Sequence, residues 1–285
     1  MILVFGKTGQ VATELQSLKD VIALGRDNAD LSIPITCAEA IRRYEPRAVI
    51  NAAAYTAVDQ AESEENLANT INGHAPGAMA SACAERDIPL VHLSTDYVFD
   101  GKGAAPWSVA DMPNPKNAYG RSKLKGEQSI RVSGCIYAIL RTSWVVSAHG
   151  NNFIKTMRRL SETRDRITVV NDQVGGPTCA RDIAHMCISV AEKLIQDPSK
   201  SGVYHYSGQP NVSWCQFANA IFEQMDCKTI ASPISSTEHP TPAIRPLNSR
   251  LDCGVTRDTL GIARPFWRDG LKQILRDLEG EHDKA

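Results

Sequence analysis

Short apolar runs alternate with stretches of helical periodicity along the first half of the chain. Runs that are apolar enough to form buried strands cover residues 1–5, 21–24, 48–50, 90–93, 137–140 and 167–170. The stretches with the pattern of helices are residues 38–44, 75–86 and 119–130. Because strands that alternate with helices are joined by right-handed crossovers, the pattern predicts an α/β fold. We expect a Rossmann-type, doubly wound parallel sheet covered by helices on both faces.

The pattern changes after about residue 143, where prolines and turn residues become frequent. Helical stretches at 180–195 and 214–225 are interleaved with them. We therefore divide the chain into a Rossmann domain, residues 1–142, and a smaller C-terminal α/β lobe, residues 143–285, that closes over the sheet edge. The run 167–170 is expected to return to the main sheet.

Composition and charge exclude several classes of function. The chain has 285 residues, of which 42% are hydrophobic and 22% charged, as in an ordinary globular protein. A net charge of -1 without a basic stripe argues against nucleic-acid binding. No run approaches the ~18 apolar residues of a membrane span, and the N-terminus lacks the pattern of a signal peptide. We expect a cytoplasmic protein that binds neither nucleic acid nor membrane.

A glycine-containing loop follows the first apolar run at once. Residues 6–12 have the spacing G-x-x-G-x-x-A, with Gly6 and Gly9 between the first predicted strand and helix. Glycines at such a turn let backbone N–H groups approach a pyrophosphate at the helix N-terminus. The loop lacks the G-K-[ST] ending of a P-loop, so its position favours a dinucleotide.

The end of the second run bears on the choice between nicotinamide cofactors. Enzymes that use NAD place a carboxylate about 20 residues beyond the glycine loop, whereas this chain has Gly25-Arg26 there. A guanidinium suits a 2′-phosphate, so we expect NADPH. Asp27 and Asp30 are close enough in the sequence to leave NADH open.

Three polar residues suggest proton chemistry at the sheet edge. Thr95 follows the fourth run, and Tyr119 and Lys123 lie four apart, on one face of a helix. A tyrosine with a pKa of ~10 is a poor acid at neutral pH, but an ammonium within about 4–6 Å would lower that pKa. Thr95 could polarise a carbonyl. The order and spacing predict a Tyr–Lys oxidoreductase.

The chain resembles the dTDP-4-dehydrorhamnose reductase family of the extended short-chain dehydrogenase/reductase superfamily, through nearly its whole length. The matching segments are residues 5–11 (FGKTGQV), 51–59 (NAAAYTAVD), 94–99 (STDYVF), 119–123 (YGRSK), 141–145 (RTSWV), 171–173 (NDQ) and 245–251 (RPLNSRL). The resemblance implies NADPH-dependent reduction of the C4 ketone of dTDP-4-dehydro-L-rhamnose to dTDP-L-rhamnose. Residues 1–142 would then bind NADP, and residues 143–285 mainly the nucleotide-sugar substrate.

The resemblance also implies a role for each matching residue. By motif match, Gly9, Gln10 and Val11 would meet the pyrophosphate, Asp30 and Leu31 would lie near the adenine, and Ala53, Ala54, Tyr55 and Thr56 would lie along the ribose and phosphates. Gly6 and Arg26 complete the cofactor-binding residues on the arguments given above. Thr95 and Asp96 would contact the sugar, and Trp144 would pack against it. Tyr119 would give the proton to the C4 oxygen, and Lys123 would assist it and bind the nicotinamide ribose.

The chain departs from the family at a site where some members bridge a dimer with a divalent metal held by glutamates. Glu14 matches one ligand, but Arg181 stands at another, and Asp277 is an approximate third. A guanidinium has no lone pair to offer a cation, so we expect no metal. An ion pair between Arg181 and Glu14 could hold a homodimer instead, which the sequence leaves open.

Two other functions stay open from the sequence. A dehydratase of this superfamily usually carries Thr-Asp-Glu where this chain has Thr95-Asp96-Tyr97, and a tyrosine cannot replace that carboxylate base. An epimerase needs no such glutamate and is excluded less firmly. A non-catalytic, NADP-binding regulatory subunit is disfavoured, because a scaffold would not need Thr95, Tyr119 and Lys123 together.

Overall fold

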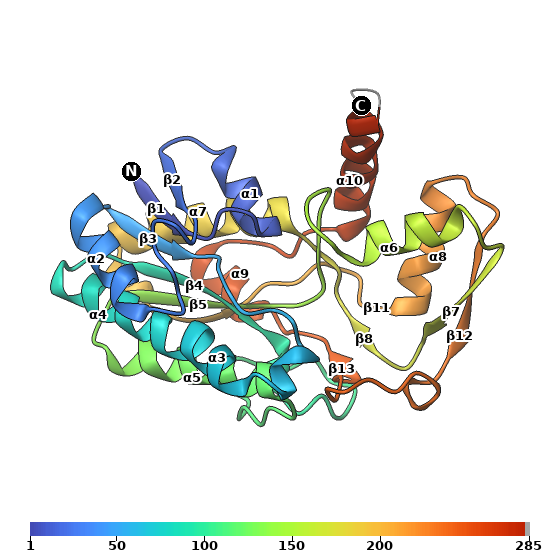
Figure 1. Cartoon of the computed structure of the whole chain (residues 1–285), viewed down its shortest axis with the longest axis horizontal. Helices are drawn as coiled ribbons and strands as arrows, with labels where there is room; N and C mark the ends of the chain where they lie inside the picture. Colours follow the sequence, from blue (N-terminus) through green and yellow to red (C-terminus); the bar gives the residue numbers. More distant parts are fainter. Residues whose placement is uncertain (283–285) are drawn as a thin grey trace.

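The computed structural model describes residues 1–282, and its centre is a six-stranded sheet (Figure 1). The strand order is β10-β5-β4-β3-β1-β2, and every pairing is parallel. The strands are β1 (Ile2–Phe5), β2 (Val21–Leu24), β3 (Ala48–Asn51), β4 (Leu90–Thr95), β5 (Tyr137–Thr142) and β10 (Gly202–His205). The predicted Rossmann-type α/β fold is confirmed.

Helices cover both faces of this sheet, because alternate side chains of each strand point to opposite sides. Ile2 and Val4 lie in one buried cluster with residues of α1 and α7. Leu3 and Phe5 lie in the other, with residues of α2 and α4. The helices of these layers are α1 (Gln10–Gln16), α7 (Ala180–Gln196), α2 (Pro34–Tyr44), α4 (Ala75–Glu85) and α5 (Ala118–Val132). Shorter elements beside them are η1 (Gln60–Glu62), α3 (Glu65–Asn69), η2 (Thr70–His74), η3 (Asp96–Val98), η4 (Pro198–Lys200) and α9 (Gly254–Leu260).

The expectation that residues 167–170 return to the main sheet is wrong. They form β7 (Arg166–Val170), which pairs in parallel with β12 (Ile230–Ile234) in a separate two-stranded sheet. Ile167 and Val169 are buried, whereas Arg166 and Thr168 are exposed. That alternation fits a strand covered on one face, while a central parallel strand is covered on both. The sixth strand is β10, which the chain reaches through α7.

The second lobe is built around a smaller core on the far side of the sheet edge (Figure 1). Its helices and strands are β6 (Val145–Val146), α6 (Phe153–Ser161), β8 (Val174–Gly175), β9 (Thr178–Cys179), β11 (Val212–Ser213), α8 (Trp214–Gln224), η5 (Ser236–Glu238), β13 (Asn248–Ser249) and α10 (Trp267–His282). Phe217 and Trp267 pack edge to face in this core, with ring centroids 5.2 Å apart. Within the lobe, β11, β8 and β13 form a three-stranded sheet on the side nearer the main sheet.

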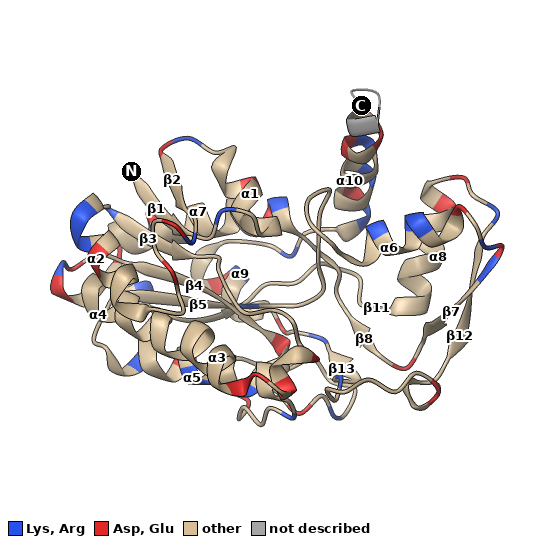
Figure 2. Ribbon diagram, in the orientation of Figure 1, with Lys and Arg blue, Asp and Glu red and all other residues tan. Residues whose placement is uncertain are grey.

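Charged side chains of both signs are scattered over the two lobes (Figure 2). They form no single-sign stripe along an element in this view, as the net charge of -1 also suggests. Within residues 1–282, none of the helices has the length and apolarity needed to cross a membrane.

Candidate active site

The strand order reverses between β1 and β3, which is where open α/β sheets form a crevice at their carboxyl ends. Gly6 directly follows β1 with a φ of 108°, and a Cβ there would lie 3.2 Å from the backbone nitrogen of Ala53. Gly9 precedes α1, and a Cβ built on it would meet no atom within 4 Å. The loop therefore approaches β3 closely and leaves open space in front of α1, which fits a pyrophosphate held by backbone N–H groups.

The structure brings the other predicted cofactor residues to the same edge, although in different ways. Ala53, Ala54, Tyr55 and Thr56 directly follow β3. The phenol of Tyr55 donates a hydrogen bond to Glu64 Oε2 (2.7 Å), and its backbone nitrogen donates to the side chain of Asn72 (2.8 Å). These bonds fix the path of the segment after β3.

The side chain of Gln10 points to the second lobe. Its Oε1 accepts hydrogen bonds from Ser147 Oγ (3.0 Å) and Asn152 Nδ2 (3.1 Å), and its Nε2 donates to the carbonyl of Val145 (3.4 Å). Val11 is 6% exposed and belongs to the sheet core. Only the backbone of Gln10 and Val11 is thus left for the predicted pyrophosphate contact.

The loop after β2 carries the residues predicted to select the cofactor. Arg26 is exposed. The pKa of Asp30 is lowered chiefly by hydrogen bonds from the backbone and side chain of Ser32, which burial opposes, and the charge of Arg26 makes the smallest contribution. The Asp30 carboxylate accepts the backbone N–H of Ser32 at 2.8 Å. Leu31 is buried in the sheet core. Arg26 therefore faces water at the carboxyl end of β2, as a residue for a 2′-phosphate must.

Thr95, Tyr119 and Lys123 are brought together by β4 and α5. Thr95 is the last residue of β4, and α5 begins next to it, capped by Asn117, whose Oδ1 accepts the N–H of Gly120 at 2.8 Å. A Cβ at Gly120 would lie 2.2 Å from the carbonyl oxygen of Tyr97. This backbone contact sets α5 against the strand end, and the Thr95 hydroxyl is near enough to the Tyr119 phenol to act on its pKa.

Burial dominates the electrostatics of the centre. It raises the pKa of Tyr119 to about 12, with the Thr95 hydroxyl acting in the opposite direction. Burial lowers the pKa of Lys123 to about 8, against the pull of the Glu127 carboxylate. Lys123 Nζ contacts the carbonyl oxygen of Leu93 (2.6 Å) and Nε2 of His92 (3.2 Å). The pKa of Tyr119 is therefore raised, opposite to the shift expected from the sequence, and Lys123 is not among the groups that act on it.

Two buried polar groups beside the centre have unused hydrogen-bonding capacity. Asp96 is 2% exposed, and burial raises its pKa to about 6. Its Oδ1 is bonded to the Thr95 hydroxyl at 3.1 Å, while its Oδ2 has no partner among the described residues. Arg245 donates from NH2 to Asp59 Oδ2 (2.6 Å), and its NH1 is likewise buried without a partner in that part of the chain. Sequence reasoning gave Asp96 a role but assigned none to Arg245.

Trp144 lies in an aromatic stack. Its φ of 50° turns the chain sharply after β5, and its ring stacks on Trp214 with centroids 3.6 Å apart and an angle of 9°. A Cβ at Gly175 would lie 2.9 Å from the Trp144 ring. Trp214 was missed by sequence reasoning because a single tryptophan at a helix start carries no signal of its own.

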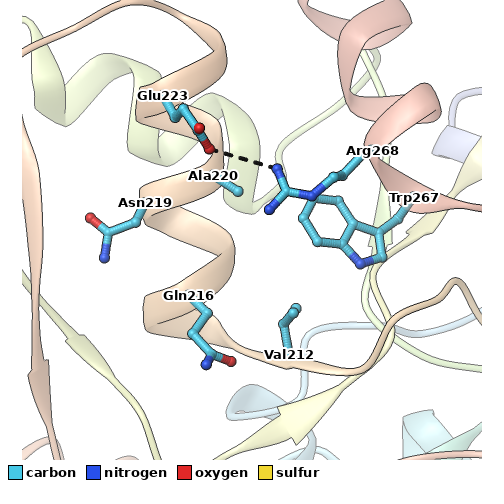
Figure 3. A pocket seen from close by; sticks show the side chains of 7 residues that line it. All are labelled: Val212, Gln216, Asn219, Ala220, Glu223, Trp267 and Arg268. Atoms are coloured by element: carbon cyan, nitrogen blue, oxygen red, sulfur yellow. Dashed lines mark ion pairs between the residues drawn. The ribbon is translucent and has the colours of Figure 1, made fainter.

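A cavity of about 500 Å³ lies elsewhere, between α8 and α10 (Figure 3). Its lining residues are Val212, Gln216, Asn219, Ala220, Glu223, Trp267 and Arg268. The Arg268 guanidinium lies 3.7 Å from the Glu223 carboxylate across it, and its carbon sits 4.8 Å from the Trp267 ring centroid. None of the predicted site residues contributes to this cavity.

Comparisons with known proteins cover almost the whole chain. The family model described as the RmlD substrate binding domain matches residues 1–279. The dTDP-4-dehydrorhamnose reductase of Sinorhizobium fredii is 41% identical over 284 residues, 96% of each chain, and that of Shigella flexneri is 38% identical over 291 residues, 97% of each. The chain belongs to the dTDP-4-dehydrorhamnose reductase family.

Solved structures from this reductase family agree in fold. One from Clostridium acetobutylicum has a TM-score of 0.90 and 36% identity, covering 98% of this chain and 99% of that one. A second, from Bacillus anthracis, is a complex with NADP; it has a TM-score of 0.90 and 34% identity, covering 97% and 98% of the two chains.

Glu14, Arg181 and Asp277, which were compared above with a bridging metal site, form an ion-pair cluster within the chain. Arg181 Nε lies 3.3 Å from Glu14 Oε2, and Arg181 NH2 lies 3.1 Å from Asp277 Oδ2. His149 Nε2 is 3.6 Å from the other Glu14 oxygen. The guanidinium thus sits between the two carboxylates of one chain, so both approximate ligands are already paired. Among residues 1–282, no group of three or more His, Cys, Asp or Glu residues is arranged to hold a metal.

Proposed function

We propose that the protein catalyses the NADPH-dependent reduction of the C4 ketone of dTDP-4-dehydro-L-rhamnose to dTDP-L-rhamnose. One observation carries this proposal: Thr95, Tyr119 and Lys123 meet at the carboxyl edge of a dinucleotide-binding sheet, in a chain that matches the reductase family from residue 1 to residue 279. Bound NADPH would supply the hydride to C4. The protein itself would supply the proton and would bind and orient the substrate.

The proton requirement falls on Tyr119. With its pKa raised to about 12, the phenol keeps its proton at neutral pH, which is the state a reductase needs. We assign it the transfer of that proton to the C4 oxygen as the hydride arrives, and the hydroxyl of Thr95 a hydrogen bond to the same oxygen. Lys123 would contact the nicotinamide ribose. The pKa values of Tyr119 and Lys123 are shifted this strongly because buried groups are shifted far more than exposed ones.

The rest of the sugar nucleotide would contact buried polar groups whose hydrogen-bonding capacity is not used within the described residues. The unpartnered Oδ2 of Asp96 and NH1 of Arg245 are supporting observations for polar contacts to the substrate, because buried polar atoms in proteins are nearly always bonded. We assign Trp144 an apolar contact with the sugar. Tyr97 argues against a dehydratase: its ring packs edge to face on Tyr119, 5.5 Å between centroids, where a carboxylate base would be needed.

The cofactor would be held by Gly6, Gly9 and the backbone of Gln10 and Val11 at the pyrophosphate, and by the segments 30–31 and 53–56 along the adenosine and ribose. Arg26 would favour NADPH through the 2′-phosphate. We further propose that residues 1–142 provide most of the cofactor site and the second lobe most of the substrate site, and that the enzyme works in the cytoplasm.

The test is direct turnover. The purified protein is given dTDP-4-dehydro-L-rhamnose, made by coupled enzymatic synthesis, and the oxidation of NADPH and of NADH is followed side by side. Formation of dTDP-L-rhamnose in equal amount to NADPH consumed supports the proposal. Release of a C4 ketone with altered stereochemistry and no net NADPH consumption would identify an epimerase instead.

A further inference from the structure

The side chain of Gln10 joins the glycine loop to the second lobe. Gln10 is the first residue of α1, and the backbone N–H groups at the start of a helix have no partner within it. Its side chain turns away from the loop to residues 145–152 of the second lobe. There the amide is bonded to the carbonyl of Val145 (3.4 Å), to Ser147 Oγ (3.0 Å) and to Asn152 Nδ2 (3.1 Å). One residue thus touches both halves of the proposed site.

Asn152 fixes which end of the Gln10 amide faces which partner. Asn152 caps α6, where its Oδ1 accepts the backbone N–H of Lys155 at 3.3 Å. Its Nδ2 therefore points to Gln10 and can only donate, so the Gln10 atom that faces it is the oxygen. The NH₂ end of Gln10 then faces the carbonyl of Val145, which can only accept. Because both ends of the amide meet complementary partners, neither a carboxylate nor an apolar side chain could replace all of these bonds.

A second residue of α1 contacts the same segment. Glu14 lies one turn beyond Gln10 and therefore on the same face of the helix. One of its carboxylate oxygens is 3.6 Å from Nε2 of His149, and the other is 3.3 Å from Nε of Arg181 on α7. Glu14 is 7% exposed. The helix thus holds residues 145–152 at two points that are one turn apart.

The segment held in this way begins directly after Trp144. The carbonyl of Trp144 accepts the N–H of Thr178 at 3.1 Å, and the next carbonyl, that of Val145, accepts from Gln10. The φ of Trp144 is 50°, a backbone conformation that few residues other than glycine adopt. Such a conformation persists only where the surrounding structure holds it. The placement of the Trp144 ring therefore depends in part on the bond from Gln10 to Val145.

We propose that Gln10 is a positioning residue that couples the cofactor site to the substrate site. The inference rests on the proposed function and deepens it by stating how the two sites depend on each other. Gln10 would be fixed through its backbone when a pyrophosphate is bound in front of α1, and its side chain would then restrict residues 145–152. The nucleotide sugar meets an already ordered segment and loses less conformational entropy on binding. By linkage, each ligand tightens the binding of the other by the same factor.

Gln16, at the other end of α1, offers a matched control. Its Nε2 donates to the carbonyls of Lys7 (2.7 Å) and Ala12 (3.0 Å), both in the first domain. These bonds support the glycine loop without reaching the second lobe. A purely structural role of a glutamine in α1 would show in both Gln10→Met and Gln16→Met, whereas the coupling should be lost only in Gln10→Met.

The first measurement is hydrogen exchange in the full-length protein, with and without saturating NADP⁺. In the wild type, NADP⁺ should slow the exchange of the backbone amides of residues 145–152 by about fivefold or more, the lower end of a typical coupling. Gln10→Met should lose this protection, and Gln16→Met should keep it. Equal protection in the wild type and Gln10→Met, or none in the wild type, would overturn the inference.

Asn152→Ser tests the same contact from the second lobe and leaves the glycine loop unchanged, so it also serves if Gln10→Met does not fold. A serine keeps an N-cap oxygen for α6 but is too short to donate to the Gln10 oxygen. The protection by NADP⁺ should therefore decrease in this variant. Protection equal to that of the wild type would contradict a route through Gln10.

Calorimetry then measures the coupling itself, with dTDP-L-rhamnose as the probe. Its affinity for the wild type should be about fivefold or more higher when NADP⁺ is bound. The ratio should fall to near one in Gln10→Met but not in Gln16→Met, and an equal ratio in the wild type and Gln10→Met would refute the coupling. The exchange measurement needs no sugar. A protein that shows the NADP⁺-dependent protection but does not reduce the 4-keto sugar would therefore refute the proposed reaction and not this inference.

Discussion

Two parts of the same sheet edge differ in how they are held: the centre (Thr95, Tyr119 and Lys123) is buried or half-buried, whereas residues 26–28 of the loop after β2 are exposed. Lys123 is 2% exposed and contacts His92 and the carbonyl of Leu93, whereas Arg26 is exposed to water. A group that exchanges protons needs its pKa set in advance by burial and neighbours. A group that recognises a phosphate can remain hydrated until the ligand arrives. Substitutions in the centre should therefore act on chemistry, substitutions of the buried residues that support it on stability, and substitutions in the loop on cofactor choice alone.

The largest expected effect is on the proton donor. Tyr119→Phe should lower kcat ~10²–10⁴-fold, because the C4 oxygen loses its positioned acid. Binding of NADP, measured by calorimetry, and the thermal midpoint should stay close to wild type. Tyr137→Phe is the matched control. Tyr137 lies at the amino end of β5, away from the carboxyl edge of the sheet, so this variant should keep full turnover. Normal turnover by a folded Tyr119→Phe protein would remove the mechanism proposed above.

The buried residues that support the centre should be nearly as sensitive to substitution, but the quantity that changes is the free energy of unfolding. Arg141→Met leaves the fully buried Glu127 carboxylate with Ser94 as its remaining close partner, and breaking such a pair costs about 3–5 kcal/mol. Urea unfolding measures the change. The control is Arg131→Met, whose exposed guanidinium lies 4.0 Å from the same carboxylate; it should cost at most ~1 kcal/mol. Equal losses from the two substitutions would mean that Arg141 is not the partner that holds Glu127.

The exposed loop should give a smaller and more selective effect. Arg26→Asp should reduce the preference for NADPH over NADH by about 1.5–3 kcal/mol, the contribution of a hydrogen bond to a charged group. That corresponds to roughly 10- to 150-fold in the ratio of the two kcat/KM values. Arg43→Asp, the same change at an exposed position on α2, should leave the ratio alone. A ratio unchanged by Arg26→Asp would place the 2′-phosphate elsewhere.

The smallest effect concerns the Glu14–Arg181–Asp277 cluster, outside both regions. Turnover and sedimentation of the wild-type protein should be the same with and without EDTA, because a guanidinium cannot ligate a cation. Arg181→Gln should cost no more than ~1 kcal/mol in urea unfolding, as for other partly exposed ion pairs. Inactivation by the chelator, reversed by Mg²⁺, would show a metal site that this cluster does not explain.

The sequence was sufficient for the features that depend on local pattern. Apolar runs located five of the six central strands, and the spacing of Tyr119 and Lys123 placed both on α5. It failed at β10, where Gly202 and His205 bound a run of only two apolar residues. The strand is recognisable only through its pairing with β5, which lies more than sixty residues earlier in the chain.

The parts of the candidate site that sequence reasoning missed depend on contacts between distant segments. Arg245 reaches Asp59 across a separation of 186 residues, and the Lys123–His92 contact joins a helix to a strand. His92 is buried and its ring nitrogen Nδ1 lies 3.0 Å from Asn51 Nδ2. The contact of the His92 ring with Lys123 could be found only from the structure, because packing decides how α5 lies against β4. The raised pKa of Tyr119 follows from burial, which the sequence alone did not give.

Within residues 119–123, Gly120 is needed for folding, whereas Tyr119 and Lys123 are needed for the proposed catalysis. Its lack of a Cβ allows the first turn of α5 to touch the Tyr97 carbonyl, so every other residue there would push the helix away from the strand. In a library selected only for soluble expression, glycine should therefore return at position 120 while positions 119 and 123 drift. A relative that keeps this glycine but has lost the tyrosine and the lysine would have inherited the scaffold without the reaction.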